Sequence, residues 1–170
     1  ITIHLREDRR HIKDLDVKKI CKNNKITVNL EMAANLQMLK IALKNKPNYV
    51  CIVPEKRKEI TTEGGLNIKK NKKFIERMIK LLKKNRIRVS LFIEPNINDI
   101  KLSQALGSNC VELHTGNYCN LLNKGKSTRK SLARLKNSAN FAKKLGLEVH
   151  AGHGLTYRSA YQLSKIKNIS

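Results

Sequence analysis

The 170-residue sequence contains no tryptophan, and aromatic residues make up only 4% of it. Proteins that bind single-stranded nucleic acids commonly stack the bases on aromatic side chains, so this chain is poorly equipped for that mode of binding. No apolar run approaches the roughly 20 residues that a transmembrane helix needs. Charged residues also interrupt the N-terminal apolar segment at once, unlike in a signal peptide. We therefore expect a soluble, cytoplasmic protein.

Common cofactor and metal signatures are also missing. No G-x-G-x-x-G segment follows an expected strand, and neither the Walker sequence G-x-x-x-x-G-K-[ST] nor H-E-x-x-H occurs. The cysteines include no C-x-x-C pair, so we expect reduced, mostly buried thiols rather than disulfides or a zinc site. These cysteines are Cys21, Cys51, Cys110 and Cys119.

Acidic residues are few compared with basic ones, and the formal net charge is +23. Such a charge can neutralise nucleic-acid phosphates, so a basic nucleic-acid-binding domain stays open as an alternative function. The lysines, however, are spread over almost every expected helix. We favour a solvated basic surface, whose field would also attract small anionic substrates.

Six short apolar segments alternate along the chain with segments of helical periodicity. This order predicts parallel strands joined by helical crossovers, as in a doubly wound sheet or a (β/α) barrel. We expect loops at residues 55–66 and between Gly116 and Ser127, with Asn98 capping the helix after the fourth strand. The expected strands are residues 1–5, 26–32, 49–54, 88–95, 110–116 and 148–154.

Each expected strand ends at a titratable residue. In a barrel these strand ends would converge on one pocket at the carboxyl face of the sheet, whereas a doubly wound sheet would leave most of them unused. Several acids and bases in one pocket suit general acid–base chemistry, with a metal-dependent barrel enzyme as an alternative. The residues are His4, Glu31, Glu55, Glu94, Glu112, His114 and His153.

Three further stretches have the composition of phosphate sites. Arginine forks match phosphate oxygens, and hydroxyl groups with unobstructed backbone N–H groups also hold anions. Glycines beside His153 would let a ligand approach the backbone closely. The stretches are Arg6 to His11, Thr61 to Gly65, and Gly152 with Gly154.

Seven ordered segments resemble the pyridoxine 5'-phosphate synthases of the deoxyxylulose-dependent vitamin B6 pathway. The resemblance covers essentially the whole chain. The segments are HLREDRRHI (His4–Ile12), NLEMA (Asn29–Ala33), VPEKR (Val53–Arg57), TTEGGL (Thr61–Leu66), VSLFI (Val89–Ile93), ELHTG (Glu112–Gly116) and AGHGLTY (Ala151–Tyr157).

This resemblance implies a (β/α)8 TIM-barrel transferase that forms a homo-octamer and uses neither metal nor organic cofactor. It would condense 1-deoxy-D-xylulose 5-phosphate with 3-amino-2-oxopropyl phosphate to pyridoxine 5'-phosphate, phosphate and water. His4 and Glu31 would be proton acceptors, His153 a proton donor, and Glu112 would stabilise a transition state. The implied substrate-binding residues are Arg6, His11, Thr61 and Gly154.

The sequence departs from the family at both ends. The family has a strand before the segment that begins at His4 and another after the segment that ends at Ser170. We therefore expect a single TIM-barrel domain over residues 1–170 that holds about six of the eight β/α units. We further expect open sheet edges and no turnover by this chain alone.

Overall fold

The computed structural model describes residues 1–170 except 24, 56–58, 60 and 62–63. The described residues form one sheet of six parallel strands with seven helices. The strands are β1 (Thr2–His4), β2 (Asn29–Ala33), β3 (Tyr49–Val53), β4 (Arg88–Ile93), β5 (Cys110–His114) and β6 (Glu148–Gly152). The helices are α1 (Asp14–Cys21), α2 (Leu36–Asn45), α3 (Lys72–Lys84), α4 (Ile97–Ala105), α5 (Gly116–Asn123), α6 (Arg129–Lys144) and α7 (Tyr157–Leu163).

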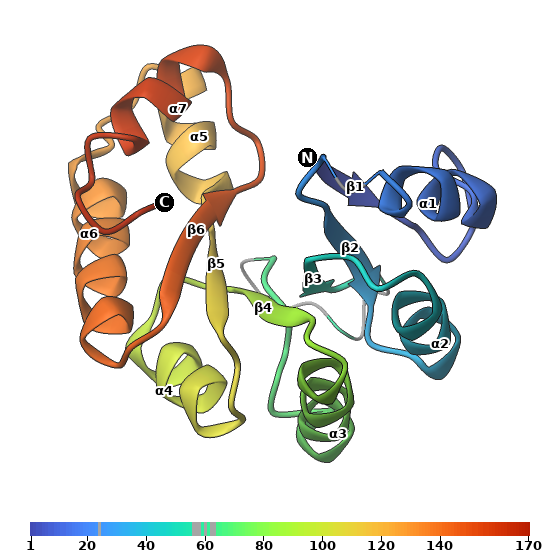
Figure 1. Ribbon diagram of the computed structural model, residues 1–170. Coiled ribbons are helices and arrows are strands. Elements are labelled where there is room, and N and C mark those ends of the chain that lie inside the picture. The colour runs from blue at the N-terminus through green and yellow to red at the C-terminus, as the bar shows by residue number, and fades with distance from the viewer. Residues whose placement is uncertain (24, 56–58, 60, 62–63) are drawn as a thin grey trace.

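The sheet is curled, with the strands in the order in which they occur along the chain. Helices α1, α2, α3, α4 and α6 lie along the outside of the curve (Figure 1). Each strand pairs in parallel with the next, and among the described residues β1 and β6 are the two edges. The expected architecture is therefore confirmed: this is a TIM-barrel-like α/β fold of which six strands are present.

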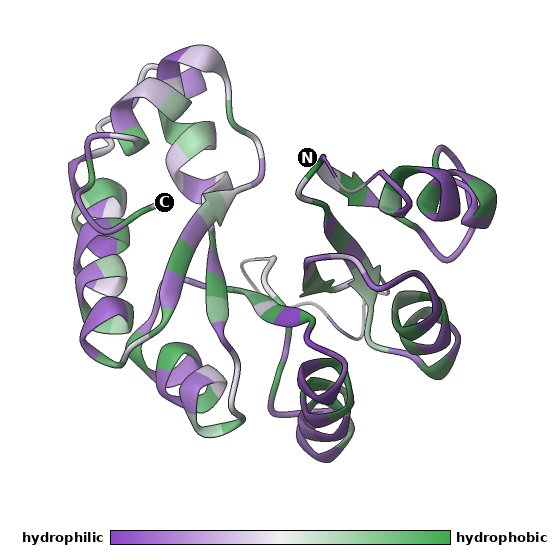
Figure 2. Ribbon diagram, viewed as in Figure 1, coloured by the Kyte–Doolittle hydropathy of each residue, from purple (hydrophilic) through white to green (hydrophobic). Residues whose placement is uncertain are grey.

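The core lies between the convex face of the sheet and the outer helices. In α3 the buried residues are spaced three, one and three apart, which places them on one helix face. They are Ile75, Met78, Ile79 and Leu82. Lysines occupy the other face of α3, and Figure 2 shows the same division between apolar and polar sides on the outer helices. Much of the excess positive charge thus lies on exposed helix surfaces.

The concave face of the sheet carries several of the predicted site residues. Successive residues of a strand point to opposite faces, so every second residue faces the inside of the curve. The strand register runs from His4 to Glu31 to Cys51 and places these three residues side by side. Val53, Phe92 and Cys51 form a small apolar cluster separate from the main core.

Three details of the predicted local structure were wrong. The expected loop after Gly116 begins with helix α5, which buries Tyr118 and Cys119. Its Asn- and Lys-rich composition concealed a short helix that buries only three residues. Asn96 rather than Asn98 caps α4, because the Asn96 side chain accepts the N–H of Asp99. Five of the six described strands end one or two residues before their predicted ends, whereas β2 ends at Ala33, one residue later than predicted.

Two other expectations concern particular segments. All four cysteines are free, and Cys51, Cys110 and Cys119 are buried, which confirms the prediction of reduced thiols. The expected loop at residues 55–66 lies partly outside the described residues. Its described end is attached to β4, since the Leu66 N–H donates to the Phe92 carbonyl at 2.8 Å. Within the described part of the chain, no helix is long and apolar enough to cross a membrane.

Candidate active site

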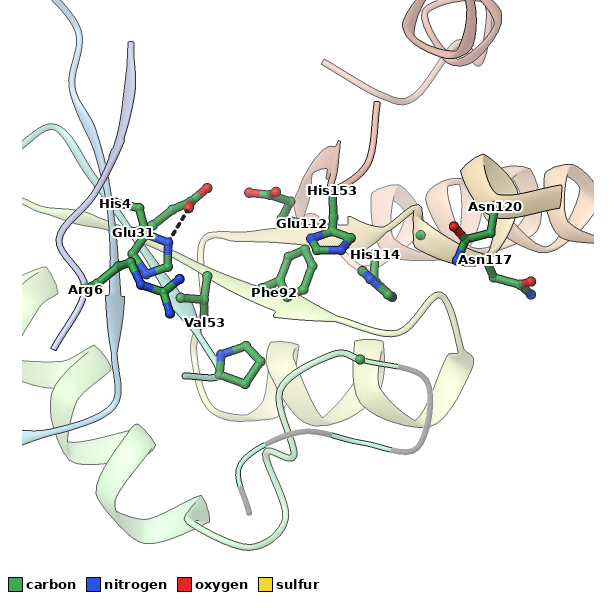
Figure 3. Close-up of a pocket in the computed structure, with 13 residues that line it drawn as sticks. His4, Arg6, Glu31, Val53, Phe92, Glu112, His114, Asn117, Asn120 and His153 are labelled. Carbon is green, nitrogen blue, oxygen red and sulfur yellow. Dashed lines mark ion pairs between the residues drawn. The ribbon is translucent and has the colours of Figure 1, made fainter. Parts of the chain in front are cut away.

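A cavity of about 940 Å³ lies at the carboxyl ends of the strands, on the concave side of the sheet. Figure 3 shows its two sides: His4, Arg6 and Glu31 on one, and Glu112 and His153 on the other. All five were predicted as site residues. The remaining lining residues are Val53, Pro54, Gly64, Phe92, His114, Gly116, Asn117 and Asn120.

On the β1–β2 side, His4 lies between two carboxylates. Its Nδ1 is 3.4 Å from Oε2 of Glu31, and its Nε2 is 3.2 Å from Oε1 of Glu55. The other oxygen of Glu55 accepts the backbone N–H of Glu7 at 2.7 Å. The imidazole is therefore held at both nitrogens, with a carboxylate within reach of each for proton exchange.

Glu31 itself is only partly exposed. Burial raises its pKa, while the neighbouring His4 has the opposite, smaller effect. A carboxylate with a raised pKa is a stronger base than an exposed one, so Glu31 is suited to accept a proton near neutral pH.

On the opposite side, Glu112 extends from β5. Burial raises its pKa, and the negative charge of Glu31 across the cavity raises it further. The Cys51 thiol donates to Oε2 of Glu112 at 3.5 Å. Burial, followed by the charge of Glu112, raises the pKa of Cys51 well above its usual value, so the sulfur stays a neutral S–H donor. The charge of Glu31 thus disfavours ionisation of Glu112.

His153 follows β6 and lies against a second histidine. The ring centroids of His114 and His153 are 4.8 Å apart, and Phe92 packs edge-on against His114 at 5.2 Å. His153 has a φ of 83°, an uncommon conformation for a residue other than glycine. The Thr115 hydroxyl holds it there by donating to the His153 carbonyl at 2.6 Å. Burial, and then the proximity of His114, lowers the pKa of His153.

The whole chain, residues 1–170, matches the family described as pyridoxal phosphate biosynthesis protein PdxJ. The chain belongs to this family. It is 58% identical over 170 residues to the pyridoxine 5'-phosphate synthase of Pelagibacter ubique, matching all of this chain and 71% of that relative. It is 48% identical over 172 residues to the synthase of a Sulfurihydrogenibium strain, covering 99% of this chain and 70% of the relative. The predicted family is confirmed.

Among solved structures, the PdxJ chain is similar to 3-keto-L-gulonate-6-phosphate decarboxylase from Vibrio cholerae. The TM-score is 0.66 at 15% sequence identity, over 99% of this chain and 73% of that protein. At so low an identity the similarity concerns the fold alone. It agrees with the curled parallel sheet of this PdxJ protein.

Three predicted substrate-binding residues of this PdxJ protein are not part of the cavity wall. His11 is exposed in the segment between β1 and α1, and Gly154 is exposed next to His153. Thr61 is half-buried, and its hydroxyl accepts the N–H of Gly64, which does line the cavity, at 3.2 Å. Their roles therefore remain predictions. Arg6 lines the cavity, with its Nε 3.6 Å from Oδ1 of Asp8.

Sequence reasoning missed two polar residues at the far side of the PdxJ cavity. Asn117 and Asn120 project from the first turn of α5, which was expected to be a loop. Their spacing of three residues directly after Gly116 was the available signal, because it is the spacing of neighbours on one helix face. In the described residues, no group of three His, Cys, Asp or Glu side chains is arranged to hold a metal ion.

The burial of Glu112 leads to a prediction about stability. A carboxyl whose pKa is higher in the folded chain than its unfolded value of 4.5 favours folding at low pH, and this contribution is lost as the pH rises through the folded pKa. Glu112→Gln should therefore raise the free energy of unfolding at pH 7 by on the order of 1 kcal/mol. The gain should shrink towards about pH 4, where the carboxyl is neutral in both states. Urea unfolding at the two pH values measures both differences.

Glu76→Gln is the matched control for this measurement. Glu76 is on α3 and pairs with Lys80, whose hydrogen bond lowers the pKa of Glu76. Removing that carboxylate should produce no gain at pH 7. A Glu112→Gln variant that loses stability relative to the parent as the pH rises would contradict the role assigned to burial.

Proposed function

We propose that these residues form the active site of a pyridoxine 5'-phosphate synthase. It would condense 1-deoxy-D-xylulose 5-phosphate with 3-amino-2-oxopropyl phosphate, releasing phosphate and water. The observation that carries the proposal is the pairing of His4 and Glu31 with Glu112 and His153 across one cavity, in a chain of the PdxJ family. The cavity volume of about 940 Å³ suits two small phosphorylated substrates.

The chemistry consists of proton transfers. Imine formation between the amine and the ketone removes protons from nitrogen and delivers one to the departing hydroxyl group. Elimination of phosphate and ring closure each require a further base and acid. We assign His4 and Glu31 as proton acceptors and His153 as a proton donor. The opposed pKa shifts of Glu31 and His153 support these assignments, since they bring a carboxylate and an imidazole towards a common proton affinity.

Glu112 would stabilise the positive charge that develops on nitrogen during imine formation. Its carboxylate faces the cavity from the side opposite His4, and the Cys51 thiol holds one of its oxygens. A carboxylate in a partly dry cavity interacts more strongly with such a charge than one in water. The closeness of Glu31 makes this carboxylate easier to protonate, so Glu112 and Glu31 would titrate as a coupled pair.

Two phosphate groups require two anion sites. We propose that Arg6, His11 and Thr61 bind the phosphate of 1-deoxy-D-xylulose 5-phosphate, and that the Gly154 backbone contributes to the other site. Arg6 already lines the cavity, and Gly154 has a φ of 73° with no side chain to block a ligand. The positive net charge would accelerate the approach of both substrates.

We further propose a cytoplasmic homo-oligomer, an octamer by family resemblance. Large apolar side chains on the described surface support self-association, among them Leu15 at 68% exposure and Tyr157 at 99%. Analytical ultracentrifugation of the purified protein measures this state directly. A monomer at micromolar concentration would refute the oligomer without affecting the catalytic assignments.

The proposed function is tested in two proteins. One is the 170-residue chain, and the other is a chimera in which these residues replace the matching 71% of the Pelagibacter ubique synthase. We expect the chimera to form pyridoxine 5'-phosphate from the two substrates. We expect no turnover by the chain alone, because β1 and β6 have unpaired edges in the described sheet and two strands of the closed barrel would be needed to complete the cavity.

The two results are independent. Full activity of the 170-residue chain would show that the part of the relative outside the matched 71% is not needed for turnover. A chimera that folds, as judged by cooperative unfolding, but forms no product would refute the proposed function of these residues.

A further inference from the structure

A buried carboxylate–imidazole pair beside the cavity has no role in the function proposed above. His114 ends β5 and is 8% exposed, and Glu94 follows β4 and is 5% exposed. Nδ1 of His114 is 3.1 Å from Oε1 of Glu94. Burying ionisable groups costs free energy unless each is paired and hydrogen-bonded, so such a pair fixes the position of both side chains.

Glu94 also holds Gly65, which in turn contacts Thr61. The oxygen that faces His114 accepts the backbone N–H of Gly65 at 2.8 Å. Gly65 in turn accepts the N–H of Thr61 at 2.8 Å through its carbonyl. Oε1 of Glu94 thus contacts both His114 and Gly65. Gly65 in turn contacts Thr61, a predicted phosphate-binding residue.

The second oxygen of Glu94 faces α6. It is 3.8 Å from a guanidinium nitrogen of Arg134, whose Nε donates to the Pro95 carbonyl at 2.9 Å. This contact ties the carboxylate to the outer helix layer. Glu94 is therefore held from three directions and can hold His114 in a fixed orientation.

Two glycines, Gly64 and Gly116, lie close to the His114 ring. A Cβ at Gly64 would lie 2.7 Å from Cε1 of His114, and one at Gly116 would lie 2.8 Å from its Nε2. Real Cβ atoms do not approach so closely, so a side chain at either position would displace the His114 ring. Gly64 and Gly116 both line the cavity and both lie beside the Cε1–Nε2 edge of His114, so this edge of the ring is next to the cavity.

The hydrogen-bond donors follow from these contacts. A carboxylate only accepts hydrogen bonds, so the neutral ring must place its proton on Nδ1 and leave a lone pair on Nε2. We propose that Glu94 is a positioning residue that holds His114 as this tautomer, with Nε2 as an acceptor on the ring edge next to the cavity, and that the same oxygen holds Gly65. The acceptor would bind a hydroxyl or amine hydrogen of a substrate. This inference rests on the function proposed above.

The tautomer is tested in the 170-residue chain, without turnover. Two-bond ¹H–¹⁵N spectra distinguish a protonated ring nitrogen from an unprotonated one, and His114→Gln assigns the signals. At a pH where the ring is neutral, we expect the proton of His114 on Nδ1. A proton on Nε2 would overturn the proposal whatever the activity of the protein.

Kinetics in the chimera test whether the tautomer matters. Glu94→Gln keeps the size of the side chain and removes the charge, so we expect kcat to fall about 10- to 100-fold, as for other residues that orient a functional histidine. The signal of His114 should shift in the same variant, whereas Glu76→Gln on the surface should change neither. An unchanged kcat together with an unchanged tautomer would overturn the positioning role.

Two further measurements cover the remaining outcomes. If Glu94→Gln does not fold, Glu94→Asp keeps the charge but retracts the carboxylate, and we expect a weakened His114 signal with reduced kcat. An Asp variant with parental kcat and spectrum would also refute the proposal. A parent chimera that makes no product would refute the proposed function, while the spectra would still report the tautomer.

Discussion

Replacing Glu31 with glutamine in the chimera should lower kcat for pyridoxine 5'-phosphate formation by about 10²- to 10⁴-fold, the usual contribution of a positioned general base. The carboxylate is 3.4 Å from His4 and faces the cavity, and burial raises its pKa. Glutamine retains the shape of the side chain but cannot accept the proton. The fold should be unaffected, since the variant removes no apolar contact.

Steady-state kinetics with both substrates measure the effect, and Glu76→Gln is again the matched control. That residue undergoes the same chemical change on α3 and does not line the cavity. Glu31→Gln should leave KM nearly unchanged if the carboxylate acts mainly in the transition state. Parental turnover in a folded Glu31→Gln protein would remove Glu31 from the mechanism.

Gly152→Ala should reduce kcat by about 100-fold, the effect of displacing a catalytic group by roughly 1 Å. A Cβ at Gly152 would overlap Oε1 of Glu112, and its nearest other contacts are Cδ and Cγ of the same side chain. Glu112 must therefore move, and moving it also breaks the hydrogen bond from Cys51. The three heavy atoms nearest to that Cβ all belong to Glu112, so the alanine displaces this side chain first.

Gly125→Ala provides the comparison for that substitution. Gly125 has a φ of 63° and open space where a Cβ would be, so alanine there should cost about 1 kcal/mol of stability from backbone strain and leave kcat unchanged. Gly152 has no such strain, so its variant should show the reverse pattern of reduced kcat and nearly parental stability. Equal kcat values for the two variants would show that Glu112 is not displaced or not needed.

Local sequence patterns were sufficient to place the candidate acids and bases near the carboxyl ends of the strands. Alternation along a strand and parallel pairing bring the carboxyl ends of all strands to one face, so His4, Glu31, Glu112 and His153 could be placed in one cavity without coordinates. The family segments around them gave each a proposed role. The same reasoning failed for α5, where only Gly116, Tyr118 and Cys119 are buried and the apolar periodicity is weak.

The partners of these residues could not be read from the sequence. Glu55 contacts His4 across 51 positions of the chain, and Cys51 contacts Glu112 across 61. Such contacts depend on how far the sheet curls and on which rotamers the packed neighbours permit, and no local pattern encodes either. The same holds for Gly152 against Glu112.

The sequence by itself determined the repeating strand–helix order, the family and the candidate acids and bases, because periodicity and short motifs are local properties. Only the tertiary structure decided which groups face each other: Glu31 opposite Glu112, and Glu94 between His114 and Gly65. The physical reason is that pKa values, tautomers and steric limits arise from distances between strands. Those distances are set by the packing of the helices on the curled sheet.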